Sequence, residues 1–409
     1  MTKTSGVALA LVCLLSLTAA WGADAPQFRG PNRDGKFLDT GLLKQWPDGG
    51  PALLWSVDGL GGGWSSASVA NGAVYITGMD AQQQGQLFAF GLDGKLKWQA
   101  SYGAEDKGGG HPGARTTPTV DGDRVWVMSS TGHLASFETA TGKKLLDIDT
   151  LDRFKGVQPQ WSIAESPLID GDRVICTPGG PDASIVALNK NTGDTVWTTK
   201  GLGAPSGFCS ANLIRVGDRR LIITQLKGLV VGVDAETGQP LWQYALANKM
   251  GIQPDTPVYG DGMLYANAGR GAGGVLLQLS ADGSSVTEKW TDKTLDTFHH
   301  GVVLLNGYLY ATASTGKQLT CLEMATGKVM WQAPATGMAS LVYADGMLYA
   351  FAENGNMQLI KADPQAFAPV SSFMVTKGSG EFWAHPTIAN GQLYLRHGDS
   401  MMAFDIKAQ

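Results

Sequence analysis

Four of the six histidines in this 409-residue chain fall, with several tryptophans and carboxylates, just before short apolar segments that recur along the sequence. Indole rings stack on flat or apolar molecules. Imidazole, guanidinium and carboxylate groups add the few polar contacts that orient a bound ligand. These residues lie far apart in the chain, so only a closed ring of repeats brings them together. The candidate binding residues are Trp64, His111, Arg115, Trp161, Glu165, Asp255, His299, His300, Glu381, Trp383 and His385.

The histidines also raise the question of a metal site. His299, His300 and His385, with a carboxylate such as Glu381, carry nitrogen and oxygen atoms that bind transition metals. Neighbouring residues of an extended segment point to opposite faces, so at most one of His299 and His300 would face the centre of a ring. We therefore expect no metal site. The alternative to ligand binding is that these polar groups cap strand ends and hold neighbouring repeats together.

Catalytic motifs are missing from the sequence. There is no nucleophile elbow and no phosphate-binding loop. The glycine-rich segment 269–274 lies between two expected strands, which favours a hairpin loop over a phosphate cradle. We predict no catalytic residues.

The framework that must position the candidate residues is a repeat of about 45 residues: strand, glycine turn, strand, Thr-Gly or Asp-Gly turn, and then tryptophan. Repeats of this length built from short strands indicate a β-propeller, with one four-stranded antiparallel blade per repeat. Eight turn glycines predict an all-β ring of eight blades. They are Gly72, Gly122, Gly171, Gly217, Gly262, Gly307, Gly346 and Gly391.

Ring closure follows from the strands at the two ends of the repeat region. The last repeat supplies three strands, at 385–388, 392–395 and 400–406, and lacks the outer, tryptophan-bearing one. A segment of that type stands before the first repeat, at 52–57. Pairing the two would close the ring and remove an exposed sheet edge.

The repeat tryptophans have a structural interpretation. A large aromatic side chain at this position can fill the wedge between neighbouring blades, and its indole N–H can bond a backbone carbonyl there. Leu146 and Phe373 replace tryptophan in two repeats. The structural tryptophans are Trp55, Trp98, Trp197, Trp242, Trp290 and Trp331.

Composition and termini indicate an exported, soluble protein. The formal net charge is −5, without clusters of lysine and arginine, which argues against nucleic acid as a partner. Residues 1–23 have the basic start, apolar stretch and small residues of a signal peptide. No other apolar segment approaches the ~20 residues of a membrane-spanning helix. We expect a lead-in at 24–51, a propeller at 52–409, a monomer, and a periplasmic or secreted location.

The segment Ala-Glu-Thr-Gly-Gln-Pro-Leu-Trp at 235–242 and its copies resemble the pyrroloquinoline quinone (PQQ) repeat across residues 52–409. Residues 27–35 also resemble the lead-in of secreted bacterial PQQ-like propeller proteins. The resemblance implies either a quinoprotein dehydrogenase or a non-catalytic propeller such as BamB of outer-membrane protein assembly. The adjacent cysteines of the dehydrogenases are absent here, and so is a Cys-x-x-Cys-His haem motif.

These observations favour a non-catalytic scaffold that binds a cell-envelope protein or a small ligand at a polar, aromatic funnel, without a cofactor. The alternative is a PQQ-dependent oxidoreductase acting on alcohols or sugars. In that case the quinone would stack on Trp64, Trp161 or Trp383, with Ca²⁺ beside it. A carbohydrate-binding protein that uses the same tryptophans is a third interpretation.

Overall fold

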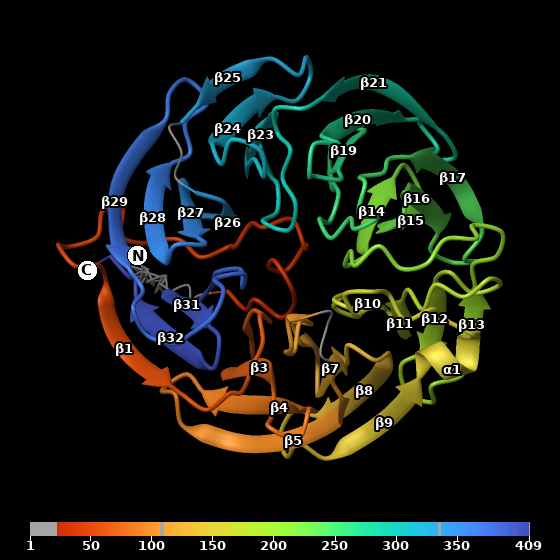
Figure 1. Cartoon of the computed structure of the whole chain (residues 1–409), viewed down its shortest axis with the longest axis horizontal. Helices are drawn as coiled ribbons and strands as arrows, with labels where there is room; N and C mark the ends of the chain where they lie inside the picture. Colours follow the sequence, from red (N-terminus) through yellow and green to blue (C-terminus); the bar gives the residue numbers. More distant parts are fainter. Residues whose placement is uncertain (1–22, 107–109, 334–336, 409) are drawn as a thin grey trace, which may run out of the picture.

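Eight antiparallel sheets of four strands each stand around a common centre in the computed structural model (Figure 1). The structure describes residues 23–106, 110–333 and 337–408. The predicted signal peptide therefore lies outside the described residues, apart from Ala23. The predicted fold, an eight-bladed β-propeller, is confirmed. In blades 3, 4 and 7, where Figure 1 labels all four strands, the first strand (β10, β14 or β26) is nearest the centre and the fourth (β13, β17 or β29) lies on the rim.

The strands follow the chain in regular order. Blades 1 to 4 contain β2 (Ser68–Ala70), β3 (Ala73–Met79), β4 (Gln84–Gly91) and β5 (Leu96–Ala104); β6 (Thr119–Asp121), β7 (Arg124–Met128), β8 (His133–Glu138) and β9 (Lys144–Asp149); β10 (Leu168–Asp170), β11 (Arg173–Cys176), β12 (Val186–Asn189) and β13 (Thr195–Thr198); and β14 (Asn212–Val216), β15 (Arg219–Leu226), β16 (Leu229–Asp234) and β17 (Pro240–Ala245). Blades 5 to 8 contain β18 (Val258–Gly260), β19 (Met263–Asn267), β20 (Gly274–Leu279) and β21 (Val286–Asp292); β22 (Val303–Leu305), β23 (Tyr308–Thr312), β24 (Leu319–Glu323) and β25 (Val329–Gln332); β26 (Ala339–Ala344), β27 (Met347–Ala352), β28 (Asn356–Lys361) and β29 (Ala368–Met374); and β30 (Thr387–Ala389), β31 (Gln392–His397), β32 (Ser400–Asp405) and β1 (Ala52–Val57).

The ring closes as the strand count predicts. β1, from the N-terminal side, pairs antiparallel with β32, from Ala52 opposite Asp405 to Val57 opposite Met401. Blade 8 therefore joins both ends of the repeat region. In the described part of the chain the single α-helix is the short α1 (Thr150–Phe154) after β9. No helix there is long and apolar enough to cross a membrane.

Tryptophans join six of the eight blades to the next blade. The indole N–H of each structural tryptophan donates to a backbone carbonyl of the following blade, which satisfies its polar atom at the seam. The bonds run from Trp55 to Leu92 (2.8 Å), Trp98 to Thr139 (2.9 Å), Trp197 to Ala235 (3.1 Å), Trp242 to Gly283 (3.2 Å), Trp290 to Met324 (3.1 Å) and Trp331 to Asp363 (2.9 Å).

The Thr-Gly turn and the tryptophan of the repeat are linked physically. Gly238 has a φ of +72°, and a Cβ there would lie 2.3 Å from the Trp197 ring of the preceding blade. A glycine is thus required both by the backbone conformation and by the close approach of the indole. Gly142 packs on Trp98 in the same way, with a Cβ distance of 2.6 Å.

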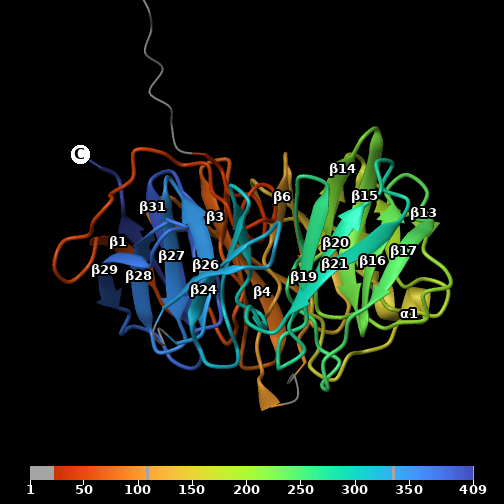
Figure 2. The same ribbon diagram turned by 90° about the horizontal axis from the view of Figure 1, so that it is seen from above.

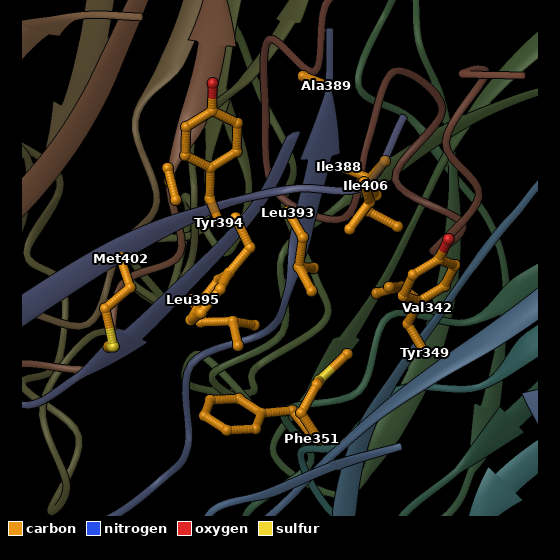
Figure 3. Packing of buried hydrophobic residues seen from close by; sticks show 14 of the residues in the cluster. Val342, Tyr349, Phe351, Ile388, Ala389, Leu393, Tyr394, Leu395, Met402 and Ile406 are labelled. Atoms are coloured by element: carbon orange, nitrogen blue, oxygen red, sulfur yellow. The ribbon is translucent and has the colours of Figure 1, made fainter. Parts of the chain in front are cut away.

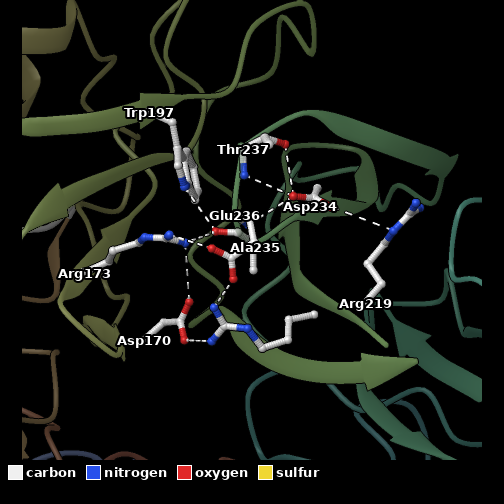
Figure 4. A network of polar contacts seen from close by, with 9 residues as sticks. Asp170, Arg173, Trp197, Arg219, Asp234, Ala235, Glu236 and Thr237 are labelled. Atoms are coloured by element: carbon white, nitrogen blue, oxygen red, sulfur yellow. Dashed lines mark hydrogen bonds and ion pairs between the residues drawn. The ribbon is translucent and has the colours of Figure 1, made fainter. Parts of the chain in front are cut away.

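Charged side chains reinforce the seam between blades 3 and 4 (Figure 4). Arg173 donates to the carbonyl of Ala235 (2.7 Å) and to the Glu236 carboxylate (2.6 Å). Arg220 bonds both Glu236 and Asp170. Half-exposed pairs of this kind add little individually, but here they form a network around the carbonyl that also accepts from Trp197.

The lead-in (residues 24–51) packs on the ring, along one of its faces in the side view of Figure 2. Ala25 pairs with Val69 of β2, and Lys36 pairs with Tyr343 of β26. Between these points Arg29 and Arg33 enter the centre of the ring, where both are buried. Arg33 donates to carbonyls of blades 3 and 4, and Arg29 to the carbonyl of Val302 (2.6 Å) before β22.

The hydrophobic core is divided among the blade interfaces. In the largest cluster Val342, Tyr349 and Phe351 of blade 7 pack against Leu393, Tyr394 and Leu395 of blade 8 (Figure 3). The lead-in adds Phe37, Leu42 and Trp46 to this cluster. Burial of this apolar surface fixes the lead-in to the blades on which it lies.

Candidate functional site

A pocket of about 260 Å³ lies at the centre of the ring. Segments that precede the inner strands of blades 1 to 6 and 8 contribute to it, together with Phe28 of the lead-in and Arg270 of the β19–β20 loop. We call it the central pocket. It brings together seven predicted site residues from distant parts of the chain. They are Trp64, His111, Arg115, Trp161, His299, Trp383 and His385.

Aromatic rings form a continuous wall on one side of the central pocket. Trp64 and Trp383 contact each other with ring centroids 5.1 Å apart. The ring centroid of His111 lies 6.3 Å from that of Trp64 and 5.0 Å from that of Trp383. It also lies 6.2 Å from the ring centroid of Trp161. This surface can stack on a planar or apolar group of a ligand.

Two guanidinium groups, those of Arg115 and Arg270, line the pocket, and the charges of Glu105, Asp106 and Glu381 oppose that of Arg115. The Arg115 guanidinium carbon lies 4.8 Å from the Trp64 ring centroid, and Arg115 Nη2 donates to the carbonyl of His111 (2.5 Å). Arg270 lies over Phe298 at 4.3 Å. Stacking on an aromatic face holds each planar guanidinium in place.

Glu381 forms a link with His111 of the pocket wall. Nδ1 of His111 lies 3.2 Å from a carboxylate oxygen of Glu381, and both side chains are half-exposed. Glu381 does not itself line the pocket. This pair connects the segment before blade 2 to the segment before blade 8.

His299 and His300 lie on the same side of the chain, so the expectation that they point apart is wrong, but only one of them, His299, lines the pocket, as expected. Their rings stack with centroids 4.0 Å apart, because residues 298–300 form a bend and not an extended strand. Nε2 of His300 lies 3.3 Å from Oε1 of Glu353, and Nε2 of His299 lies 3.7 Å from the same oxygen. Burial lowers the pKa of His300 to about 3 and that of His299 well below its usual value, so both rings are neutral at neutral pH.

His385 connects the pocket to the lead-in. Arg29 Nη1 lies 3.3 Å from Nδ1 of His385, and Nε2 of His385 lies 2.8 Å from the carbonyl of His299. An arginine only donates, so the proton of this imidazole is on Nε2 and bonds the carbonyl. His385 thereby ties blade 8 to blade 6 and to Arg29.

Glu165 and Asp255 lie behind the pocket wall and do not line it. Glu165 accepts from the backbone N–H (2.7 Å) and hydroxyl (2.5 Å) of Thr177. Burial raises its pKa to about 7, against the opposing effects of those bonds and of the Arg33 charge. Both carboxylates are thus buried and form their hydrogen bonds inside the ring, not with the pocket.

The carboxylate of Asp255 compensates the positive charge of Arg29, the second buried arginine of the lead-in. It accepts from the backbone N–H of Gly301 and from Asn267, each at 3.0 Å. Burial raises its pKa to about 6, and the charge of Arg29 opposes this shift. The buried carboxylates and the buried arginines therefore balance one another's charge across the centre of the ring.

Several site residues are absent from the set predicted by the sequence: Phe28, Phe208, Arg270, Phe298 and Glu353. Phe208 and Phe298 lie, like Trp161, in the segment before the inner strand of their blade and carry the same signal. Segment 269–274 is the hairpin loop that we expect, between β19 and β20, but nothing in its glycine-rich pattern indicates that Arg270 turns into the pocket. Glu353 follows β27 in an ordinary turn.

Comparison with known proteins places the chain among PQQ-repeat propellers. The family model for "outer membrane protein assembly factor BamB" matches residues 47–165, 92–333 and 272–366. BamB from Burkholderia pseudomallei is 27% identical over 186 residues, which cover 43% of this chain and 45% of that protein. Quinoprotein ethanol dehydrogenase from Pseudomonas aeruginosa is 28% identical over 186 residues, 41% of this chain and 29% of that enzyme. The chain thus spans less than half of either relative.

Solved structures show the same fold at low identity. BamB from Moraxella catarrhalis superposes with a TM-score of 0.62 at 17% identity, covering 87% of this chain and 98% of that one. Quinohemoprotein alcohol dehydrogenase from Comamonas testosteroni gives 0.70 at 12% identity, covering 94% and 80%. The family model matches well over half of the chain, and the chain belongs to the PQQ-repeat propeller family described as outer membrane protein assembly factor BamB.

Proposed function

We propose that this protein is a non-catalytic binding scaffold of the cell envelope, and that its central pocket receives a segment of its partner. The observation that carries this proposal is the composition of the pocket. Its wall is aromatic and cationic, while the buried carboxylates behind it are engaged in bonds within the ring.

Proton transfer requires a general base within hydrogen-bond reach of the substrate. Glu165 and Asp255 are held away from the pocket by Thr177 and Gly301. Glu381 is engaged with His111. These three carboxylates are therefore engaged within the protein, which supports a binding role for the aromatic and cationic wall.

The chemistry of the pocket indicates the kind of segment that it would accept. Trp64 and Trp383 offer a surface for an aromatic or apolar side chain. Arg115 and Arg270 offer positive charge to a carboxylate beside it. A segment that carries an aromatic residue next to an acidic one matches both features. The name of the BamB relatives, assembly factors of the outer membrane, agrees with a cell-envelope protein as the partner.

Site-specific photo-crosslinking in growing cells tests the proposal. Met250 lines the pocket and is 46% exposed, so a photoreactive residue there reaches a bound segment. Leu96, on the rim strand β5 and 54% exposed, is the matched control. We expect a defined cell-envelope adduct from position 250 that the Arg115→Gln, Arg270→Gln double variant weakens. Equal adducts from both positions, or adducts that ignore the arginines, would reject the pocket as the binding site.

A PQQ-dependent oxidoreductase is the second candidate, and one observation favours it. Flat indole surfaces and two guanidinium groups also suit a planar, anionic quinone. The described carboxylates suit Ca²⁺ poorly, because Glu165 and Asp255 are turned into the ring interior. Calorimetric titration with PQQ, with and without Ca²⁺, separates the two proposals. Tight, calcium-dependent, one-to-one binding that Trp383→Ala abolishes would favour the oxidoreductase, and no heat would favour the scaffold.

A further inference from the structure

We propose that His299, His300 and Glu353 bind a transition-metal ion of the zinc type at the wall of the central pocket. One potential ligand atom from each of the three lies within 4.8 Å of the others. Among the described residues, no other three histidine, cysteine, aspartate or glutamate side chains meet in this way. Two imidazoles and one carboxylate are a ligand set that Zn²⁺ and related ions accept.

The distances match the spacing of metal ligands. Two atoms that each lie about 2.0–2.1 Å from a tetrahedral Zn²⁺ are roughly 3.4 Å apart. Oε1 of Glu353 lies 3.3 Å from Nε2 of His300 and 3.7 Å from Nε2 of His299. The ligand nitrogens of His299 and His300 lie within 4.8 Å of each other and their rings are stacked, so binding one ion would also require the rings to rotate towards each other.

The histidines have unused nitrogen atoms. Nε2 of His299 is buried and has no hydrogen-bond partner, although it faces Glu353. A buried polar atom without a partner is costly, and an ion between the three residues would provide one. The His300 side chain is fully buried, and Trp383 Nε1 donates to Oε1 of Glu353 (3.1 Å). These contacts hold two of the three ligands in place before an ion binds.

The fourth position of such an ion would be open. His299 lines the central pocket, whereas His300 and Glu353 lie behind it, so the free position would face the pocket. Three protein ligands and one open position are the arrangement of zinc sites that bind a further ligand. An anion in the pocket would then meet both the metal and Arg270. This inference does not depend on the proposed scaffold function.

Titration of chelator-treated protein with Zn²⁺ by calorimetry, and with Co²⁺ by visible absorption, tests the site directly. We expect one ion per chain, with the absorption bands of four- or five-coordinate Co²⁺. The His299→Gln and Glu353→Gln variants should each lose more than about tenfold in affinity. Their thermal unfolding in the absence of metal should match the unsubstituted protein, which separates ligand loss from misfolding.

The His133→Gln variant is the matched control. His133 lies near two carboxylates on the rim, with Nδ1 3.2 Å from Asp147 and Nε2 3.7 Å from Asp149. The carboxylates contact opposite ring nitrogens, so they cannot converge on one ion with a shared imidazole atom. Its metal affinity should equal that of the unsubstituted protein. Absence of stoichiometric binding, or binding unchanged in both His299→Gln and Glu353→Gln, would overturn the proposal.

Discussion

Arg33 in the lead-in donates from Nη1 to the carbonyl oxygen of Ala211, 3.1 Å away and 178 residues later in the chain. The same atom bonds the carbonyl of Ser166 at 2.9 Å. Nη2 bonds the Thr119 hydroxyl at 3.3 Å. One buried side chain thus joins blades 2, 3 and 4 from the axis of the ring, in addition to the bonds between their inner segments, such as that from the Thr119 hydroxyl to the Pro167 carbonyl.

Replacing Arg33 should destabilise the protein strongly. Arg33→Met removes the donors to these carbonyls and leaves Glu165 without its opposing charge. Removing one member of a buried charged arrangement costs about 3–5 kcal/mol of unfolding free energy. Urea unfolding monitored by tryptophan fluorescence measures the loss. Arg215→Met, at an exposed position of β14, should change the free energy by less than about 0.5 kcal/mol. Equal effects of the two variants would contradict this role of Arg33.

The sequence predicts the blades well, but it does not predict that Arg33 enters the axis of the ring and binds three blades there. Each blade leaves a periodic signal, because Gly122 or Gly238 must adopt positive φ and Trp197 must fill a seam. Arg33 binds mainly backbone carbonyls. Every residue has a carbonyl, so the sequence does not indicate which residues accept these bonds. Its partners in three blades become neighbours only when the ring is closed.

Two turn glycines, one in the β6–β7 turn and one beside a seam tryptophan, provide a second prediction. Gly122 and Gly238 both have positive φ, but a Cβ at Gly122 meets nothing within 4 Å, whereas one at Gly238 collides with Trp197. Gly122→Ala should cost about 1–2 kcal/mol from backbone strain alone. Gly238→Ala should cost a further ~1–3 kcal/mol from overpacking. Thermal unfolding compares the two variants. Identical losses would show that the indole contact adds nothing.

The candidate site was predictable where it follows the repeat. Trp64, Trp161 and Trp383 each lie in the segment before the inner strand of their blade, and they meet in the pocket. Glu165 shares that region, yet its side chain turns into the interior because Thr177 and the charge of Arg33 hold it there. Glu353 approaches His300 from another blade. Such a contact depends on the orientation of individual side chains, which periodicity does not determine.

The buried carboxylate of Glu165 makes stability depend on pH. Its pKa is about 7 in the folded protein and about 4.3 in an unfolded chain, so the folded state binds more protons between these values. The stabilisation that Glu165 gives the folded state by binding a proton is therefore fully present below about pH 4.3, and it is lost as the pH rises towards 7. Glu165→Gln should flatten this fall, while Asp48→Asn, at an exposed position of the lead-in, should not. Urea midpoints from pH 5 to 8 measure the slopes. A slope unchanged in Glu165→Gln would show that the carboxylate is ionised throughout.

Ring closure by β1 makes the two ends of the repeat region interdependent. Replacing residues 51–58 with a Gly-Ser linker of equal length removes the partner of β32 and the Trp55 bond to Leu92, while the lead-in stays attached. The seam between blades 8 and 1 should then open, so that unfolding no longer occurs in one cooperative transition. The uncovered edge of β32 should also promote self-association. Calorimetry and size-exclusion chromatography detect these effects, and adding a peptide of residues 51–58 should reverse both. A single transition at the original temperature would mean that the ring does not need β1 for its closure.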